Sequence, residues 1–419
     1  MRSLGEAVRQ GDARAVEALL ADGADPDGLD DTDGVPVLCL AVAAYDDAVV
    51  EVLLNAGADR RTPLTWAVDG GSVGMVRALL YAPEPPEDPA VRAELLDRAR
   101  RWTRTGTEAG LRRRTGSTAP VRRERVEDTA HSCHYEQLTL GGATVRDGHA
   151  GVLSELEECF GSRAPFDELC ARALTRPDPD HAVWSASASV AAGPMDEETW
   201  AEALALARHP DRLRRLFAAD VLLRMILGET RVEDGRVVLR EPFAGRAPDL
   251  FPWAAEERDP EVLAAVLNAL TQEESPQIEA LGLSYRTHPD ARVRVMALYA
   301  LERGPDGLLV RDGNLAVVTE LARDPDPAVR ASVCGWLSDY PGRAPELADV
   351  LHELTYEDEQ LVRIHAVKGL ADRDDPRCVE AERRIGTVDV TGWPDTWLLD
   401  AVRRYEERRD RADSSRTSP

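Results

Sequence analysis

The stretch Ala7–Asp25, AVRQGDARAVEALLADGAD, returns 34 residues later as Ala41–Asp59, AVAAYDDAVVEVLLNAGAD. A repeat of this length is typical of helix pairs that stack on one another, and not of a single closed core. A looser repeat follows near the C-terminus in the segments 289–301, 325–337 and 357–370. The sequence therefore predicts an all-α repeat solenoid.

Each N-terminal copy contains two short apolar stripes with a break between them, which is Gly11-Asp12 in the first copy. Gly23 and Gly57 follow the second stripe, where a left-handed residue commonly ends a helix. A third copy has the same pattern, with buried positions expected at Ala67, Val68, Val76, Leu79 and Leu80. Three helix pairs are therefore expected at this end of the chain.

The third copy also contains Thr62-Pro63-Leu64-Thr65-Trp66-Ala67, close to the T-P-L-H-x-A motif of ankyrin repeats. Residues 4–82 resemble the ankyrin family, with Thr65 and Cys39 in the place of the motif's histidine. Asp33-Gly34 fits the hairpin finger of the second copy, and we predict a type I′ turn there. The resemblance implies inner helices that line a surface for a protein partner. The candidates for contacting that partner are Tyr45, Trp66, Asp31, Asp33 and Arg60.

The third copy departs from the ankyrin pattern. Leu38 and Leu64 are only 26 residues apart, so most of the third finger is missing. Repeat units usually need at least three copies to be stable alone, and this unit has about two and a half. We therefore expect the ankyrin unit to pack on the segment that follows it.

Aspartates are frequent between Asp25 and Asp33. An EF-hand reading fails, because Leu29 and Leu40 would stand at the first and twelfth ligand positions. We interpret this stretch as a solvated acidic finger, and we predict no metal site, no cofactor and no catalytic residue in the chain.

The chain has 419 residues and a net charge of −25, which disfavours unspecific binding of its body to phosphate backbones. Its six cysteines form no CxxC pair, no signal peptide is visible at the N-terminus, and no apolar run approaches the length of a membrane helix. Only Lys368 among 51 basic residues is a lysine, as in proteins from GC-rich bacterial genomes. We expect a cytoplasmic bacterial protein with no membrane contact.

Ten arginines lie between Arg98 and Arg125, against Glu108 and Glu124, so this stretch carries a net charge of +8. One reading is an anion or nucleic-acid contact through Arg112, Arg113, Arg114, Arg122 and Arg123. The other, which we favour, is that the segment lies against the chain's own acidic residues or stays solvated. Nucleic acid is therefore not the expected partner.

Two features follow the arginines. Residues 135–146, YEQLTLGGATVR, predict a β-hairpin that turns at Gly141-Gly142. Just before it, His131-Ser132-Cys133-His134 has no matching second ligand pair, so ordinary packing is favoured over a zinc site.

The C-terminal copies share the pattern D-x-x-[VL]-R-x-x-A-x-x-x-L, with the arginine at Arg215, Arg294, Arg330 and Arg363. Leu263 replaces it in one copy. Residues of about 205–380 resemble the HEAT family, including its short bacterial form. The resemblance implies that these arginines link neighbouring repeats and that the aspartates cap helix starts. A second hairpin is expected at Asp234-Gly235.

We therefore predict a short ankyrin unit packed on a HEAT-like α-solenoid, with small β-hairpin insertions. The expected parts are ankyrin repeats in 1–82, an arginine-rich connecting segment in 83–148, a solenoid in 149–405 and a disordered tail in 406–419. The leading functional hypothesis is a non-enzymatic scaffold for protein–protein interaction, whose partner is unknown. The alternative is a nucleic-acid-binding or base-modifying protein that uses Arg98–Arg125. A lyase acting on a bilin-like or peptide substrate has less support.

Overall fold

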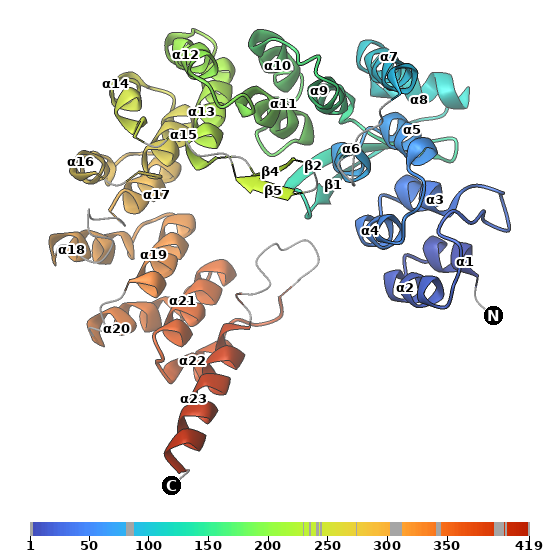
Figure 1. The fold of residues 1–419 in the computed structure, drawn as a ribbon. Coiled ribbons are helices and arrows are strands. Elements are labelled where there is room, and N and C mark those ends of the chain that lie inside the picture. The colour runs from blue at the N-terminus through green and yellow to red at the C-terminus, as the bar shows by residue number, and fades with distance from the viewer. Residues whose placement is uncertain are drawn as a thin grey trace. The chain divides into compact units, whose positions relative to one another are not determined.

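The computed structural model describes residues 3–80, 88–228, 230–233, 236–239, 243, 245–273, 275–301, 312–340, 345–388, 398 and 400–417. The chain divides into two compact units, residues 1–243 and 244–419. Within the described residues, helices dominate both units, and the strands form small antiparallel sheets (Figure 1). This confirms the predicted all-α repeat solenoid with β insertions.

Three helix pairs open the first unit: α1 (Leu4–Arg9) with α2 (Ala13–Ala21), α3 (Val37–Ala44) with α4 (Asp47–Asn55), and α5 (Arg61–Gly70) with α6 (Val73–Leu80). The first helices of the pairs, α1, α3 and α5, pack in one row, and α2, α4 and α6 pack in a second row. All five apolar positions expected in the third copy are buried. Gly23 and Gly57 have positive φ, as the helix-end pattern predicts.

The finger between α2 and α3 turns differently from the prediction. A type I′ turn needs a positive φ at Asp33, but only Gly34 has one. Asp30, which is buried, organises the turn instead. Its carboxylate accepts hydrogen bonds from the backbone N–H groups of Thr32 and Asp33 at 2.9 and 3.1 Å, and Arg9 pairs with it at 2.8 Å.

The connecting segment forms α7 (Pro89–Thr105), α8 (Thr107–Thr115) and a sheet of β1 (Arg122–Asp128), β2 (Cys133–Leu140) and β3 (Ala143–Arg146). The predicted hairpin is confirmed, because β2 pairs with β3 and Leu140 lies opposite Ala143 across two glycines with positive φ. Strand β1, which the sequence did not predict, pairs with the other edge of β2.

The ankyrin repeats share one core with α7, β2 and the helix that follows the sheet, as the incomplete third copy predicts. Leu95 of α7 and Val152 of α9 (His149–Cys159) belong to the same buried cluster as the ankyrin helices. The buried hydroxyl of Tyr135 accepts hydrogen bonds from the N–H groups of Val73 and Gly74 at 3.1 and 3.3 Å. These groups start α6 and have no partner within that helix.

The remaining elements of the first unit are α10 (Phe166–Ala173), α11 (Ala182–Ala192), α12 (Glu197–Ala205), a 3-10 helix (Leu206–Arg208), α13 (Arg212–Leu227), β4 (Thr230–Glu233) and β5 (Arg236–Leu239). Helices α9, α11 and α13 pack in a row, with α10 and α12 beside them. Strands β4 and β5 pair as expected for the second hairpin, and its turn at Asp234-Gly235 lies outside the described residues.

The second unit contains a 3-10 helix (Ala247–Leu250), α14 (Phe251–Glu256), α15 (Pro260–Leu270), α16 (Pro276–Tyr285), α17 (Ala291–Tyr299), α18 (Asp312–Leu321), α19 (Pro327–Asp339), α20 (Pro345–Leu354), α21 (Gln360–Asp372), α22 (Arg377–Glu382) and α23 (Ala401–Thr417). Helices α15, α17, α19 and α21 stack in a row, and each packs against the helix before it. Apolar residues of α19, α20 and α21 form much of the core.

A repeated set of hydrogen bonds ties four helices, α13 of the first unit and α17, α19 and α21 of the second, to the loops that precede them. Nη1 of the arginine donates to the carbonyls five and six residues before it at Arg215, Arg294, Arg330 and Arg363. Arg294 also pairs with Asp324 at 2.6 Å, and Arg330 with Glu357 at 2.8 Å, each in the following repeat. Aspartates cap the N-termini of α13, α15, α17 and α19. Arg294 and Arg330 therefore link neighbouring repeats as predicted, and the predicted capping aspartates are present at these four helices.

The sequence predicts a disordered tail over 406–419, but the structure has helix α23 across Ala401–Thr417. Val402 and Tyr405 are buried and anchor the start of this helix. Arg403 and Glu407, four residues apart, form an ion pair at 2.7 Å, which favours helix continuation.

Gly71 tests the packing between the ankyrin repeats and the sheet. It has a φ of 68°, and a Cβ there would lie 2.1 Å from the carbonyl oxygen of Arg146. We expect Gly71→Ala to lower the free energy of unfolding by at least about 3 kcal/mol, because it adds a backbone clash to the left-handed strain. The matched control is Gly57→Ala, with a φ of 89° and no atom within 4 Å of its Cβ, which should cost about 1 kcal/mol. Equal losses in urea denaturation would refute this account.

Arg294 tests the links between repeats. Its partner Asp324 is buried, so Arg294→Gln leaves a carboxylate without its cation, and we expect local stability to fall by about 3–5 kcal/mol. The control is Arg292→Gln, because Arg292 is 54% exposed and its pair with Asp290 should contribute below about 1 kcal/mol. Hydrogen exchange of the α17 and α19 peptides, read by mass spectrometry, measures both. Similar protection in the two variants would contradict the linking role.

The ion pair of Arg294 and Asp324 also predicts that the local stability of α17 and α19 falls at acid pH. Burial raises the pKa of Asp324, but hydrogen bonds from Arg294 and from the backbone of Asp326 outweigh burial, so the pKa lies below its ordinary value. A lowered folded-state pKa contributes stability above the unfolded-state value of about 3.9, and that contribution is lost as the pH falls further. The protection of the α17 and α19 peptides, taken relative to the intrinsic exchange rate at each pH, should therefore fall below about pH 4, and Arg294→Gln should weaken that dependence.

Candidate functional site

The first helices of the ankyrin pairs present a row of equivalent positions on the side turned away from α2, α4 and α6. On α3, Leu40, Ala43 and Ala44 have the three- and four-residue spacing of one helix face, and both alanines are exposed. The repeat offsets place Glu6 and Arg9 of α1, Gln10 at its C-cap, and Trp66, Asp69 and Gly70 of α5 at the same positions. We call these nine residues the inner face.

The inner face has an apolar middle and a charged end. Leu40 and Trp66 are half-buried and pack against the core with part of their surface, beside the exposed alanines. Glu6 and Arg9 on α1 are exposed. An apolar centre with a polar rim is the usual anatomy of a protein-binding patch.

The predicted partner-binding residues of the finger lie close to this face. Asp31 and Asp33 are exposed, and Asp33 pairs with Arg9 of the inner face at 2.5 Å. Leu29, at the base of the finger, is 62% exposed. Arg60 lies apart from this group, half-buried, with Nη1 donating to the carbonyl of Leu79 at 3.4 Å.

Tyr45 joins the ankyrin repeats to the sheet. It has a φ of 56° at the end of α3, where the first and third copies have Gly11 and Gly71. Its hydroxyl donates to the carbonyl of Gly70 at 2.9 Å, and the guanidinium of Arg146 lies 4.0 Å from its ring centre. These contacts offset the left-handed strain and give Tyr45 a structural role.

Most arginines of the connecting segment are paired within the first unit. Arg100 pairs with Glu157, Arg112 and Arg123 with Glu108, and Arg122 with Glu124. The favoured reading, that the segment lies against the chain's own acidic residues, therefore describes most of these side chains. Arg113 and Arg114 of the predicted anion site differ, because they are exposed and form no hydrogen bond or ion pair within the described part of the chain.

Sequence reasoning missed Trp102 and Asp69. The indole Nε1 of Trp102 donates to Asp69 at 2.8 Å, and Arg98 pairs with the same carboxylate at 2.8 Å. These contacts place α7 at the end of the inner face. The sequence offered one indication of this site, which is that an aromatic residue, Trp102, directly follows Arg100 and Arg101.

The histidines of the connecting segment contact carboxylates. His131 lies 2.9 Å from Asp128, and His134 lies 2.9 Å from Asp178. Among the residues that the structure describes, no group of three His, Cys, Asp or Glu side chains is arranged to hold a metal ion. The described helices also include none that is long and apolar enough to cross a membrane.

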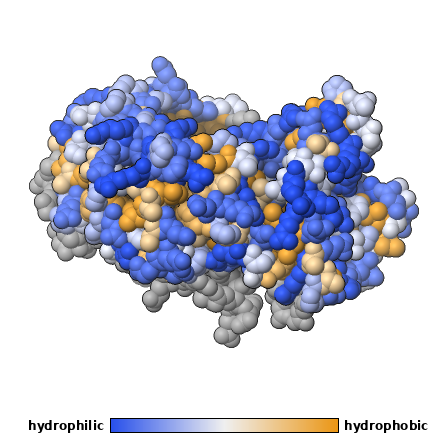
Figure 2. Space-filling model, turned by 90° about the horizontal axis from the view of Figure 1, so that it is seen from above, coloured by the Kyte–Doolittle hydropathy of each residue, from blue (hydrophilic) through white to orange (hydrophobic). Residues whose placement is uncertain are grey.

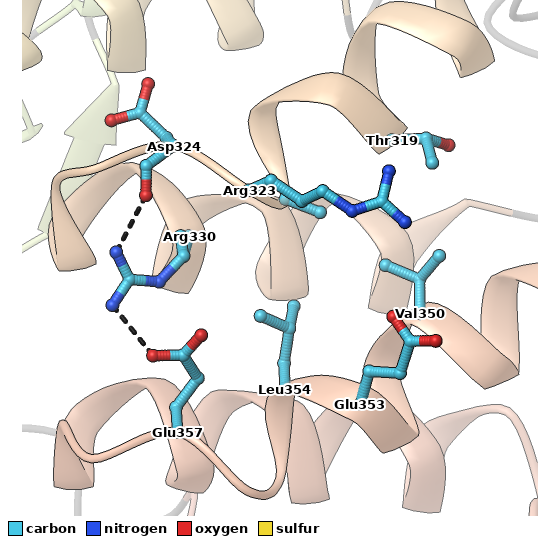
Figure 3. Close-up of a pocket in the computed structure, with 9 residues that line it drawn as sticks. Thr319, Arg323, Asp324, Arg330, Val350, Glu353, Leu354 and Glu357 are labelled. Carbon is cyan, nitrogen blue, oxygen red and sulfur yellow. Dashed lines mark hydrogen bonds and ion pairs between the residues drawn. The ribbon is translucent and has the colours of Figure 1, made fainter.

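A cavity of about 430 Å³ lies in the second unit between α18, α19 and α20. Figure 3 shows Arg330 bridging Asp324 and Glu357 on one side, while Arg323 and Glu353 extend on the other side of Leu354. The bridge is one of the repeated links described above, so this cavity lies between consecutive repeats. Figure 2 shows one face of the molecule, on which hydrophilic residues predominate and hydrophobic residues gather in small patches.

A protein-family profile described as "Ankyrin repeats (3 copies)" matches residues 4–89. No curated protein matches the sequence. The chain has some similarity to two solved structures. One is YibA of Escherichia coli, with 17% identity and a TM-score of 0.39, covering 57% of this chain and 93% of that one. The other is an engineered protein, with 17% identity and a TM-score of 0.37, covering 96% and 94%.

The profile match agrees with the row of three helix pairs, the buried apolar stripes and the left-handed glycines. Residues 4–89 of this chain are ankyrin repeats.

Proposed function

We propose that this chain is a non-enzymatic scaffold that binds a protein partner on the inner face of its ankyrin repeats. Ankyrin repeats generally mediate protein–protein interaction. The observation that carries the proposal is the exposed apolar middle of the inner face, formed by Leu40, Ala43 and Ala44 beside Trp66. Small side chains on α3 allow a partner to approach the helix closely, and Trp66 offers a large apolar anchor.

The charges beside the inner face suit a partner with basic residues. Asp31 and Asp33 of the finger are exposed, and so is Glu6 of α1. A segment that places an apolar side chain on Ala43 and Ala44 would bring its flanking residues near these carboxylates. Opposite charges at the rim of an interface raise the association rate and fix the orientation of the partner.

We propose further that the helix pairs between about 205 and 380 form a HEAT-like array. The recurring arginines and capping aspartates support this assignment, because they occupy the same position in several of the pairs, although Leu263 replaces the arginine in one of them. Arg294 and Arg330 also pair with carboxylates of the following repeat, so we assign the arginines to linking the repeats. In this proposal the array is a second part of the scaffold.

Ala44→Glu tests the inner face. The substitution puts a charge on an exposed helical position in its apolar middle, and we expect recovery of the specific partner to fall at least about tenfold. The measurement is a quantitative pulldown from the native cell with the full chain, read by mass spectrometry.

The matched control is Ala18→Glu, an exposed alanine on α2, which lies in the other row of helices. The two variants introduce the same charge at an exposed alanine of a helix. The proposal requires at least one protein that Ala18→Glu retains and Ala44→Glu loses. If every captured protein responds equally to both variants, the inner face is not the binding surface.

A further inference from the structure

A small basic cavity lies between α7 and α8. Its volume is about 320 Å³, within the range of small-ligand sites. It is lined by Asp69, Arg98, Arg101, Trp102, Thr105, Gly110, Arg113 and Arg114. We call this cavity the arginine pocket. Four guanidinium groups line it, against the single carboxylate of Asp69.

Two of the four positive charges are balanced by neighbouring residues. Arg98 pairs with Asp69 at 2.8 Å and with Glu94 at 3.3 Å, and Arg101 pairs with Asp97. Arg113 and Arg114 form no hydrogen bond or ion pair within the described residues. The pocket therefore has two uncompensated guanidinium groups at adjacent positions.

One wall of the pocket is the uncharged indole of Trp102, which is held in place by its neighbours. Trp102 stacks on His149, with 4.5 Å between ring centres and an angle of 11°. Burial lowers the pKa of His149 to about 4, so this imidazole is uncharged at neutral pH. A Cβ at Gly110 would lie 2.2 Å from Cζ3 of Trp102, so the missing side chain lets α8 pack directly on the indole. The helix carrying Arg113 and Arg114 is thereby held against α7.

The helix position of Arg113 and Arg114 does not by itself account for the pocket. Both lie in the last turn of α8, where the helix dipole favours cations. That effect acts on one helix alone. It does not require Arg98 and Arg101 of α7 to line the same cavity, nor Trp102 to form its wall.

We propose that the arginine pocket binds a phosphate monoester. Such a group carries a charge of about −1.5 to −2 at pH 7, which matches the two uncompensated guanidinium groups of Arg113 and Arg114. Guanidinium groups bind phosphate oxygens through paired N–H donors, with more geometric specificity than ammonium groups. The group can belong to a phosphorylated side chain of a protein or to a small phosphorylated molecule. An extended nucleic acid fits less well, because the neighbouring arginines of the segment are already paired and the chain carries a net charge of −25.

This proposal goes beyond the inner face and does not depend on it. Asp69 belongs to both, so a phosphorylated partner could occupy the two together. Binding of small phosphate probes does not require the ankyrin partner. A negative result with these probes therefore leaves the scaffold proposal standing, and the reverse also holds.

Isothermal titration calorimetry of the full chain at low salt tests the pocket with two probes, inorganic phosphate and the tripeptide Ala-phosphoserine-Ala. The test variant is Arg113→Gln/Arg114→Gln, and the matched control is Arg122→Gln/Arg125→Gln. Arg122 and Arg125 are 74% and 58% exposed and do not line the pocket, so the control removes the same charge from the same segment. We expect the intact chain and the control to bind the probes, and the test variant to bind them at least about tenfold more weakly. Unphosphorylated Ala-Ser-Ala should not bind.

The two sources of the phosphate group give different results, and both support the pocket. Tighter binding of the tripeptide than of inorganic phosphate indicates a phosphorylated protein segment, whereas equal binding indicates a small phosphorylated molecule. Three results would overturn the proposal: no binding of either probe, equal weakening in the two double variants, or tighter binding of a single-stranded oligonucleotide that both double variants weaken. The last result would assign the whole arginine segment to nucleic acid.

Discussion

The buried hydroxyl of Tyr135 is the contact on which the arrangement of the first unit depends. It accepts the N–H groups of Val73 and Gly74, which begin α6 and would otherwise be buried without partners. This fixes β2 against the third ankyrin pair. The close approach of Gly71 to the chain after β3 follows, because the N–H of Gly148 donates to the carbonyl of Gly71 at 3.1 Å. No further ankyrin repeat stacks on the third pair. The contacts from Tyr135 and Gly148 cover the side of this pair on which a further repeat would pack.

The packing of α7 and α8 extends this arrangement. Asp69 lies at the end of the inner face and holds both Arg98 and Trp102 of α7. Since α8 then packs on Trp102 at Gly110, the basic turn of α8 reaches the same cavity. The inner face and the arginine pocket therefore share Asp69, and the same contacts of Asp69 with α7 position both.

Periodicity separates structural arginines from candidate functional ones. Arg294, Arg330 and Arg363 recur at one place in the repeat and contact the carbonyls of the loop before their own helix. A residue that makes the same bond at the same place in several copies is selected by the fold. Arg113 and Arg114 have no counterpart in any repeat and no ion-pair partner among the described residues, so apart from the dipole of α8 no contact within the fold accounts for their charge.

This contrast also explains what could be predicted from the sequence. The ankyrin pairs, the hairpin at Gly141-Gly142 and the linking arginines each follow from a pattern that is local or repeated. Strand β1 was missed because Arg122–Asp128 is almost entirely charged, and its pairing with β2 is set by the fold. The type I′ turn was predicted from Asp33-Gly34 alone, whereas Asp30 decides its shape.

Side-chain pairing across the fold was the hardest feature to predict. Arg112, Arg113 and Arg114 are consecutive in sequence, yet Arg112 pairs with Glu108 one turn earlier and the other two do not. The sequence could place all three in a basic segment but could not show which charges remain unbalanced. Those depend on the contact between α7 and α8, which no local pattern encodes.

Charge then constrains what kind of partner fits the first unit. Exposed carboxylates gather on the finger beside the inner face, and unbalanced guanidinium groups gather in the arginine pocket at the far end of the same row of helices. A uniformly basic partner would be repelled by the pocket, and a uniformly acidic one by the finger. A partner that used both would need basic residues at one end of its binding segment and an anionic group at the other. Because like charges oppose binding at the wrong end, this arrangement would fix the direction of the bound segment as well as its identity.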